Sequence, residues 1–194
     1  MMISISAWIA TLIALTMSLE PIPLHITQES SLSIQGTSTI HDWEVKAKSV
    51  EGNWSLPKSS WKRPKAGKDA GTGWLSLKVN DLQGSQEALN TKMYEAFKYR
   101  QFPVIAFELT EGTFGEEQGG EWPISFRGTL RMAGASQPIE IQAKWNPNTG
   151  KLRATQSIDM TEFGMTPPSA MFGSIQCGKK VMVSLNLDMT PASQ

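Results

Sequence analysis

The chain has 194 residues, of which 40% are hydrophobic and 19% charged, so we expect it to fold rather than to stay disordered. Its 18 basic and 18 acidic side chains cancel, which gives no reason to expect a nucleic-acid partner, because binding nucleic acid usually requires a basic excess. The length fits a single domain with extensions.

The N-terminal segment differs in composition from the rest of the chain. The sequence MMISISAWIATLIALTMSLEP has no charged side chain before Glu20, and its apolar run is as long as a signal-peptide core but short for a membrane span. We interpret residues 1–18 as a signal peptide, 19–30 as a junction and 31–190 as the folded domain, and we expect a periplasmic or secreted protein. Because no Lys or Arg precedes the run, a membrane anchor or a first strand are the alternatives.

Alternation of apolar and polar residues dominates the chain after this leader, and it predicts half-buried β-strands. It occurs in eight stretches, at residues 32–34, 43–47, 74–79, 104–109, 122–132, 138–145, 151–158 and 181–189. The joins AGASQP and NPNTG are short and contain turn residues, so the strands that they connect must be antiparallel.

Three segments interrupt the strand pattern. NTKMYEAFKYR places Met93 and Phe97 at helical spacing, and it predicts a helix that is capped by Asn90 and ends before Pro103. MTEFGMTPPSAMFG, residues 160–173, predicts a short helical turn followed by an ordered loop, because its Pro and Gly content excludes a long helix. The basic segment 62–73 is typical of a surface loop.

These elements predict an all-β fold with one short helix. A sandwich and a closed antiparallel barrel of eight strands both fit the pattern. The interior of such a barrel is either filled by side chains or holds one small ligand.

His41 and Asp42 in SIQGTSTIHDWEVKA are the strongest candidates for a reactive site. A catalytic triad needs a nucleophile beside the histidine and the acid, and a metal site needs three or four ligands. The whole chain has only two histidines and one cysteine, Cys177. We therefore interpret His41 and Asp42 as part of a strand-turn-strand connection. We expect no catalytic residue, no bound metal and no cofactor, and we expect Cys177 to be a small, partly buried side chain.

The apolar residues of segment 160–173 need a partner to bury them. Phe163, Met165, Met171 and Phe172 lie in an irregular stretch, and soft, flexible methionine suits a site for a long flexible ligand. A lid over the mouth of the barrel is one natural place for this segment.

Four blocks of the sequence, in order, resemble the YceI-like family, exported lipocalin-like barrels that bind polyisoprenoids and other lipids. The blocks are GTSTIHDW, MYEAFKYRQFPVIAFEL, FRGTLRMAGASQPIEIQ and IDMTEFGMTPPSAMFGSIQCGKKVMVSLNL. The resemblance spans residues 31–189. It implies an antiparallel eight-stranded lipocalin-like barrel closed around an apolar lumen, along which an isoprenoid or fatty-acyl chain lies.

We accordingly expect a binding protein rather than an enzyme, with an isoprenoid, an isoprenoid quinone or another amphiphilic lipid as its partner. The residues expected to contact the lipid are Leu75, Leu77, Met93, Phe97, Ile105, Phe107, Phe126, Leu130, Val183 and Leu185, with Phe163, Met165 and Phe172 as the lid. The alternatives are a structural or stress-related protein whose barrel is filled by its own side chains, and an enzyme that uses His41 and Asp42. The sequence leaves monomer and homodimer both open.

Overall fold

The computed structural model describes residues 21–170 and 174–192. These residues form twelve strands, two α-helices and two short 3₁₀ helices. The strands are β1 Ile22–Ile26, β2 Ser31–Ser38, β3 Trp43–Ala47, β4 Glu51–Leu56, β5 Thr72–Lys78, β6 Leu82–Gly84, β7 Val104–Phe114, β8 Trp122–Met132, β9 Ala135–Asn146, β10 Lys151–Asp159, β11 Ser169–Ala170 and β12 Ile175–Pro191. The helices are α1 Lys58–Trp61, η1 Val79–Asp81, α2 Glu87–Ala96 and η2 Met160–Phe163.

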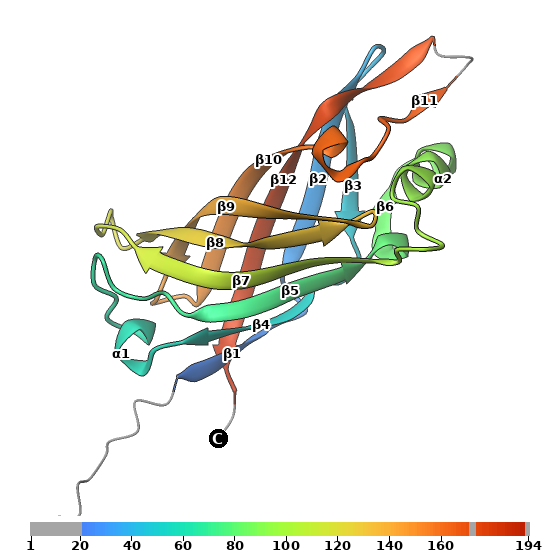
Figure 1. The fold of residues 1–194 in the computed structure, drawn as a ribbon. Helices are drawn as coiled ribbons and strands as arrows, with labels where there is room; N and C mark the ends of the chain where they lie inside the picture. The colour runs from blue at the N-terminus through green and yellow to red at the C-terminus, as the bar shows by residue number, and fades with distance from the viewer. Residues whose placement is uncertain (1–20, 171–173, 193–194) are drawn as a thin grey trace, which may run out of the picture.

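Eight of the strands close into an antiparallel barrel. Their order is β1-β4-β5-β7-β8-β9-β10-β12, and β12 pairs back with β1 through Leu24 opposite Pro191 and Ile26 opposite Met189. Figure 1 shows α1 and α2 at opposite ends of this barrel. The predicted antiparallel eight-stranded barrel is therefore confirmed.

Three sides of the barrel are each built from two strands that follow one another along the chain, β1 with β2, β3 with β4 and β5 with β6. β1 and β2 both pair with β12, β3 and β4 follow each other on the next wall, and β6 continues β5 beyond η1. The partners outside the closed ring, β2, β3 and β6, extend the sheet toward the α2 end, as Figure 1 shows. At the α2 end the sheet therefore continues as β2, β3 and β6, and β6 is its edge among the described strands.

The alternation pattern missed two strands of the closed ring, β1 and β4. β1 lies within residues 19–30, the segment that we interpreted as a junction, and its Leu24 is fully buried. β4 has the sequence EGNWSL, whose only large apolar side chains, Trp54 and Leu56, give too short an alternation to be recognised. The packed domain therefore begins near residue 22 rather than at residue 31.

We expect Leu24→Ala to lower the free energy of unfolding by about 2–5 kcal/mol, because it removes a fully buried side chain from a strand that closes the barrel. Chemical denaturation followed by Trp fluorescence measures the change. His25→Ala is the control, because His25 is an exposed neighbour on the same strand. An equal, small effect of both changes would mean that β1 is peripheral to the fold.

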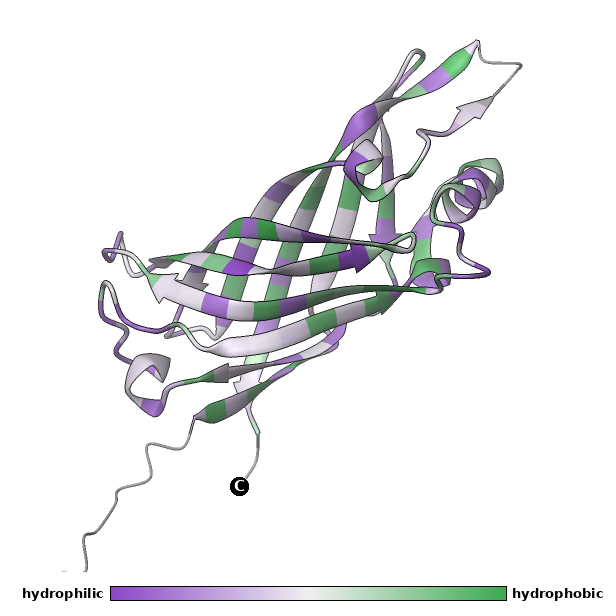
Figure 2. Ribbon diagram, viewed as in Figure 1, coloured by the Kyte–Doolittle hydropathy of each residue, from purple (hydrophilic) through white to green (hydrophobic). Residues whose placement is uncertain are grey.

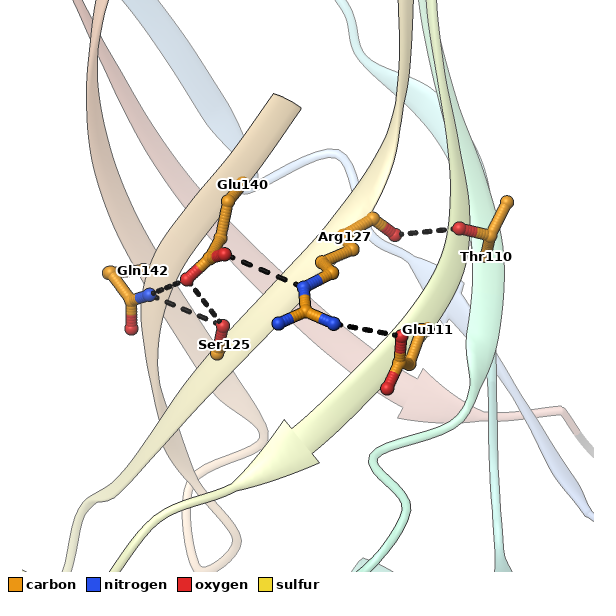
Figure 3. A network of polar contacts seen from close by, with 6 residues as sticks. All are labelled: Thr110, Glu111, Ser125, Arg127, Glu140 and Gln142. Atoms are coloured by element: carbon orange, nitrogen blue, oxygen red, sulfur yellow. Dashed lines mark hydrogen bonds and ion pairs between the residues drawn. The ribbon is translucent and has the colours of Figure 1, made fainter. Parts of the chain in front are cut away.

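The two faces of each strand differ in polarity, as the alternating colours along the strands in Figure 2 show. On the outer face of β7, β8 and β9, the Arg127 guanidinium lies 3.4 Å from the Glu111 carboxylate and 3.5 Å from that of Glu140, as Figure 3 shows. Glu140 also accepts hydrogen bonds from Ser125 at 3.0 Å and Gln142 at 2.9 Å. Such exposed pairs contribute under about 1 kcal/mol each, so their main use here is to identify the solvent-facing side of these strands.

The two short connections AGASQP and NPNTG form tight turns between antiparallel strands, as predicted. Ala133 and Gly134, both with positive φ, join β8 to β9 in a two-residue hairpin, the geometry that matches the right-handed twist of paired strands. The NPNTG turn between β9 and β10 is closed by the N–H of Gly150 donating to the carbonyl of Asn146 at 2.9 Å.

Helix α2 starts earlier than the sequence indicated. Its N-cap residue is Gln86, not Asn90. The Asn90 side chain instead accepts a hydrogen bond from the N–H of Gly84 at 2.7 Å, and the Tyr94 hydroxyl donates to the carbonyl of Leu82 at 2.9 Å. Both bonds tie the helix to β6. Within the described residues, the helices are too short or too polar to cross a bilayer.

Candidate functional site

An apolar lumen runs inside the barrel. Its volume is about 150 Å³, and 22 of its 24 lining residues are apolar. They are Leu32, Ile34, Trp43, Val45, Val50, Leu75, Leu77, Met93, Phe97, Ile105, Phe107, Leu130, Met132, Ile139, Ile141, Ala154, Ile158, Met160, Met165, Val181, Val183 and Leu185, with Ser76 and Gln156 as the polar members. The side-chain amide of Gln156 donates a hydrogen bond to the backbone carbonyl of Ser157 at 3.2 Å, so the barrel wall itself satisfies one of its N–H groups.

The strand register explains why these residues converge. Leu75 pairs with Phe107, and Phe107 pairs with Leu130 on the next strand, so the three side chains lie in one row on the same face of the sheet. The Phe107 ring lies over Gly128, where an added Cβ would overlap the ring. Gly128 therefore gives the ring its room, and a side chain there would push it into the lumen.

One end of the lumen is sealed by aromatic side chains. Trp145 packs edge-on against Trp54 at 5.1 Å between ring centroids and lies 5.2 Å from Trp61, which α1 contributes. Trp54 also packs edge-on against Phe126, at 5.7 Å. We call these four residues the tryptophan plug. The Trp54 indole N–H donates to the carbonyl of Ala70 at 2.6 Å, whereas the buried Trp145 N–H has no partner among the described residues.

The other end is closed by α2 and η2. Met93 and Phe97 come from α2, Met160 belongs to η2, and Met165 follows it; all four are buried and line the lumen. Unbranched methionine adapts its shape at low cost, so this end can change its packing more readily than the tryptophan plug.

Helix η2 is held in place by polar contacts. The Asp159 carboxylate accepts hydrogen bonds from the hydroxyl of Thr161 at 2.6 Å and from its backbone N–H at 3.0 Å. These bonds, and the ion pair with Lys179 at 3.4 Å, hold the pKa of Asp159 below its ordinary value. On the far side, Lys98 donates to the carbonyl of Gly164 at 3.3 Å. The predicted short helical turn that begins at Met160 is therefore present, and these contacts join its surroundings to β12 and to the segment after α2.

Ten of the thirteen residues expected to contact a lipid line the lumen. They are Leu75, Leu77, Met93, Phe97, Ile105, Phe107, Leu130, Met165, Val183 and Leu185. Phe126 instead belongs to the tryptophan plug and borders only a smaller hollow, of about 50 Å³, beyond the lumen. Phe163 is buried in the surrounding core but does not line the lumen. Phe172 lies outside the described residues.

Several residues that line the lumen were not among those expected to contact a lipid, although alternation placed some of them on one strand face. Ala154, Gln156 and Ile158 alternate along β10 and lie on its inner face, but the polar Gln156 interrupts the apolar pattern. Trp43 and Val45 were recognised as one face of a strand, yet their place on the lumen depends on the β2–β3 pairing.

His41 and Asp42 lie in the exposed turn between β2 and β3. The Ser38 hydroxyl donates to the carbonyl of His41 at 2.7 Å and accepts from the His41 N–H at 3.2 Å. The His41 ring lies 2.9 Å, through Nδ1, from the carbonyl of Asp42. The two residues thus form the predicted strand-turn-strand connection, with Ser38 as its organising side chain. In the part of the chain that the structure describes, no three His, Cys, Asp or Glu side chains cluster as a metal would need.

Comparisons with known proteins agree with this architecture. The family model for the YceI-like domain matches residues 25–189. The fold is similar to BcnA of Burkholderia cenocepacia, with a TM-score of 0.65 at 11% identity over 85% of this chain and 99% of that one. It is equally similar to a polyisoprenoid binding domain from Saccharophagus degradans implicated in plant cell wall breakdown, with a TM-score of 0.65 at 12% identity over 89% of this chain and 100% of that one.

A third solved structure, a YCEI protein from Campylobacter jejuni, matches with a TM-score of 0.55 at 12% identity, over 76% of this chain and 84% of that one. At such identities, the likeness establishes the fold alone. The comparison with curated proteins found no match.

Proposed function

The chain belongs to the YceI-like family, and from this premise we propose that it is an exported carrier whose lumen holds the chain of an amphiphilic lipid, by preference a polyisoprenoid or an isoprenoid quinone. Uptake and release involve no covalent step in this proposal. The lipid is held by burial of its hydrocarbon, and the protein shields that hydrocarbon from water during transport.

The observation that carries the proposal is the lumen itself. Its wall is apolar apart from Ser76 and Gln156, one end is sealed at the tryptophan plug, and the other end is closed by adaptable methionines. A cavity with one tightly packed end and one adaptable end suits a linear chain that is inserted tail first. One solved structure of the same fold is described as a polyisoprenoid binding domain, which supports this class of ligand.

Burial of hydrocarbon supplies enough free energy for binding without charged contacts. Each buried CH₂ contributes roughly 0.8 kcal/mol, so a ten-carbon chain gains roughly 8 kcal/mol before the cost of association, itself about 4 kcal/mol or more. Longer chains gain more for the same association cost. We therefore expect affinity to rise from ten-carbon to twenty-carbon isoprenoids until the lumen is full.

The volume of the lumen requires its side chains to move. About 150 Å³ is less than the roughly 300–1,000 Å³ of typical ligand sites, so a long chain fits only if the lining repacks. Met93, Met132, Met160 and Met165 are the residues that can do so at the lowest cost. Side-chain rotation at the α2 end would lengthen the lumen without changing any strand pairing.

The same small volume is the observation that favours the second candidate, a barrel filled by its own side chains that serves as a structural or stress-related interaction protein. Mass spectrometry of a solvent extract separates the two. The mature protein is purified from its native host without detergent, and the extract is analysed before and after incubation with total membrane lipid. A stoichiometric isoprenoid or acyl species supports the carrier. A clean extract in both cases contradicts it and favours the self-filled barrel.

The proposed place of action is the periplasm or the extracellular space, after cleavage of the N-terminal leader. The apolar run before Glu20 supports this. N-terminal sequencing of the protein isolated from fractionated cells tests it. A first residue near position 19 in the soluble exported fraction is the expected result, and an intact leader in the membrane fraction would contradict it.

A further inference from the structure

A second and larger hollow lies outside the lumen, at the α2 end. Its volume is about 700 Å³, and it lies between the β2–β3 turn, the first turns of α2 and the start of β12. We call it the vestibule; Ile40, Glu44, Gln86, Leu89, Lys92 and Cys177 are representative of its walls. It combines apolar side chains with polar ones, whereas the lumen is almost wholly apolar.

Trp43 separates the two spaces, because its side chain is part of the wall of both. The indole N–H donates to the carbonyl of Thr37 at 3.2 Å. The ring covers Gly36, where an added Cβ would overlap it, and Cys177 belongs to the same vestibule wall. A half-buried side chain with so few polar restraints can rotate away from its present position.

The barrel wall beside Trp43 is incomplete. β3 pairs with β6 from Val45 opposite Gly84 to Ala47 opposite Leu82, so this pairing ends before Trp43 and Glu44 are reached. Beyond Gly84 the chain turns into α2, and side chains rather than a backbone ladder close the gap. Movement of a side chain here breaks no strand–strand hydrogen bond.

We infer that the vestibule is the portal through which an amphiphile enters the lumen tail first, that Trp43 is its gate, and that the vestibule retains an uncharged, hydrogen-bonding head group. The inference rests on the proposed function and adds the route and the class of head group. A hydroxyl, a quinone ring, an ester or an amide fits this class.

The charges of the vestibule favour an uncharged head over a phosphate. Both of its lysines are already paired, Lys46 with Glu44 at 3.2 Å and Lys92 with Glu95 at 2.9 Å. Asp42 and Glu44 face the same space and would repel an anion. The amide and hydroxyl groups of Gln83, Ser85, Gln86 and Thr91 supply donors and acceptors for a neutral group instead.

The native cysteine provides a direct test, because Cys177 is the only cysteine of the chain and lines the vestibule. Geranylgeraniol is the probe, and its affinity is first measured by titration of Trp fluorescence. N-ethylmaleimide then alkylates the delipidated and the loaded protein. Burial raises the pKa of the Cys177 thiol and so slows its alkylation; both samples are therefore compared at the same near-neutral pH, where the maleimide stays selective for thiols over lysines. We expect bound geranylgeraniol to slow alkylation about tenfold or more, since the occupied vestibule excludes the reagent.

The control is the double variant Cys177→Ser, Thr155→Cys, which moves the thiol to an exposed position on β10. Its alkylation rate should not respond to the lipid. If geranylgeraniol binds but leaves the alkylation of Cys177 unchanged, the portal is wrong while the carrier function stands. If geranylgeraniol and total membrane lipid both fail to bind, the carrier function and the portal fail together.

Two further measurements examine the gate and the head group. Trp43→Ala should raise both the association and the dissociation rate of geranylgeraniol about tenfold, because the obstruction at the portal is gone. In the unmodified protein, geranylgeranyl diphosphate should bind about tenfold or more weakly than geranylgeraniol. Unchanged rates would contradict the gate, and equal or tighter binding of the diphosphate would contradict the neutral head group.

Discussion

Phe107→Asp is expected to abolish lipid uptake. Phe107 lines both the lumen and the smaller hollow beside the tryptophan plug, so any chain that fills the lumen must pass it. A carboxylate at this point would have to be desolvated by the incoming hydrocarbon, which costs several kcal/mol, and we expect affinity to fall by about 100-fold or more. Titration of geranylgeraniol measures the loss.

Ala106→Asp is the matched control for this variant. Ala106 precedes Phe107 on β7 and points to the opposite side of the sheet, so the same charge is added to the same strand on its outer face. Circular dichroism of both variants identifies any loss of structure, because removal of the Phe107 ring also costs about 3–5 kcal/mol of stability. Binding by folded Phe107→Asp at the unmodified affinity would remove Phe107 from the site.

Ala154→Phe is expected to block the lumen while the fold is retained. Ala154 pairs with Leu185 on β12 and with Ala143 on β9, and it lines both the lumen and the smaller hollow. A phenyl ring at this position occupies space that the ligand needs, yet it keeps the wall apolar. We expect binding to fall about 100-fold or more, with an overpacking cost of only about 1–3 kcal/mol.

Thr155→Phe provides the comparison for Ala154→Phe, because Thr155 is the exposed neighbour on the same strand. It should bind lipid like the unmodified protein. Since Ala154→Phe adds no charge, it distinguishes loss of space from loss of an apolar environment, which Phe107→Asp does not. Full binding by Ala154→Phe would mean that the lipid occupies another part of the molecule, and the vestibule would be the first place to examine.

Phe107 and Phe126 illustrate how far the sequence could identify the lumen. Both are inward-facing aromatic residues on neighbouring strands, and both were expected to contact a lipid. Only Phe107 lines the lumen, whereas Phe126 packs against Trp54 in the plug. Alternation reports which face of a strand a residue occupies, but it does not report how far along the barrel axis that residue lies.

Asn90 and Trp43 are two further cases. Asn90 is of a residue type that often caps helices, yet α2 already begins at Glu87. The Asn90 side chain accepts a hydrogen bond from β6 instead. Trp43 was recognised as a strand residue, but its position between two hollows arises from the end of the β3–β6 pairing and from the approach of β12. Both outcomes depend on contacts between segments distant in the chain.

The sequence by itself determined an antiparallel all-β fold, its tight turns, the helix around Met93 and the inner faces of most strands, because side-chain alternation and turn chemistry are local properties of the chain. The resemblance to the YceI-like family then favoured a closed barrel over a sandwich. The tertiary structure alone decided that residues 22–26 close the ring, which end of the lumen is sealed, and where the vestibule lies. Those features follow from strand register and from side chains that distant segments bring together, such as Trp54 with Trp145 in the plug and Trp43 with Cys177 in the wall of the vestibule. No short stretch of sequence contains both partners of such a contact.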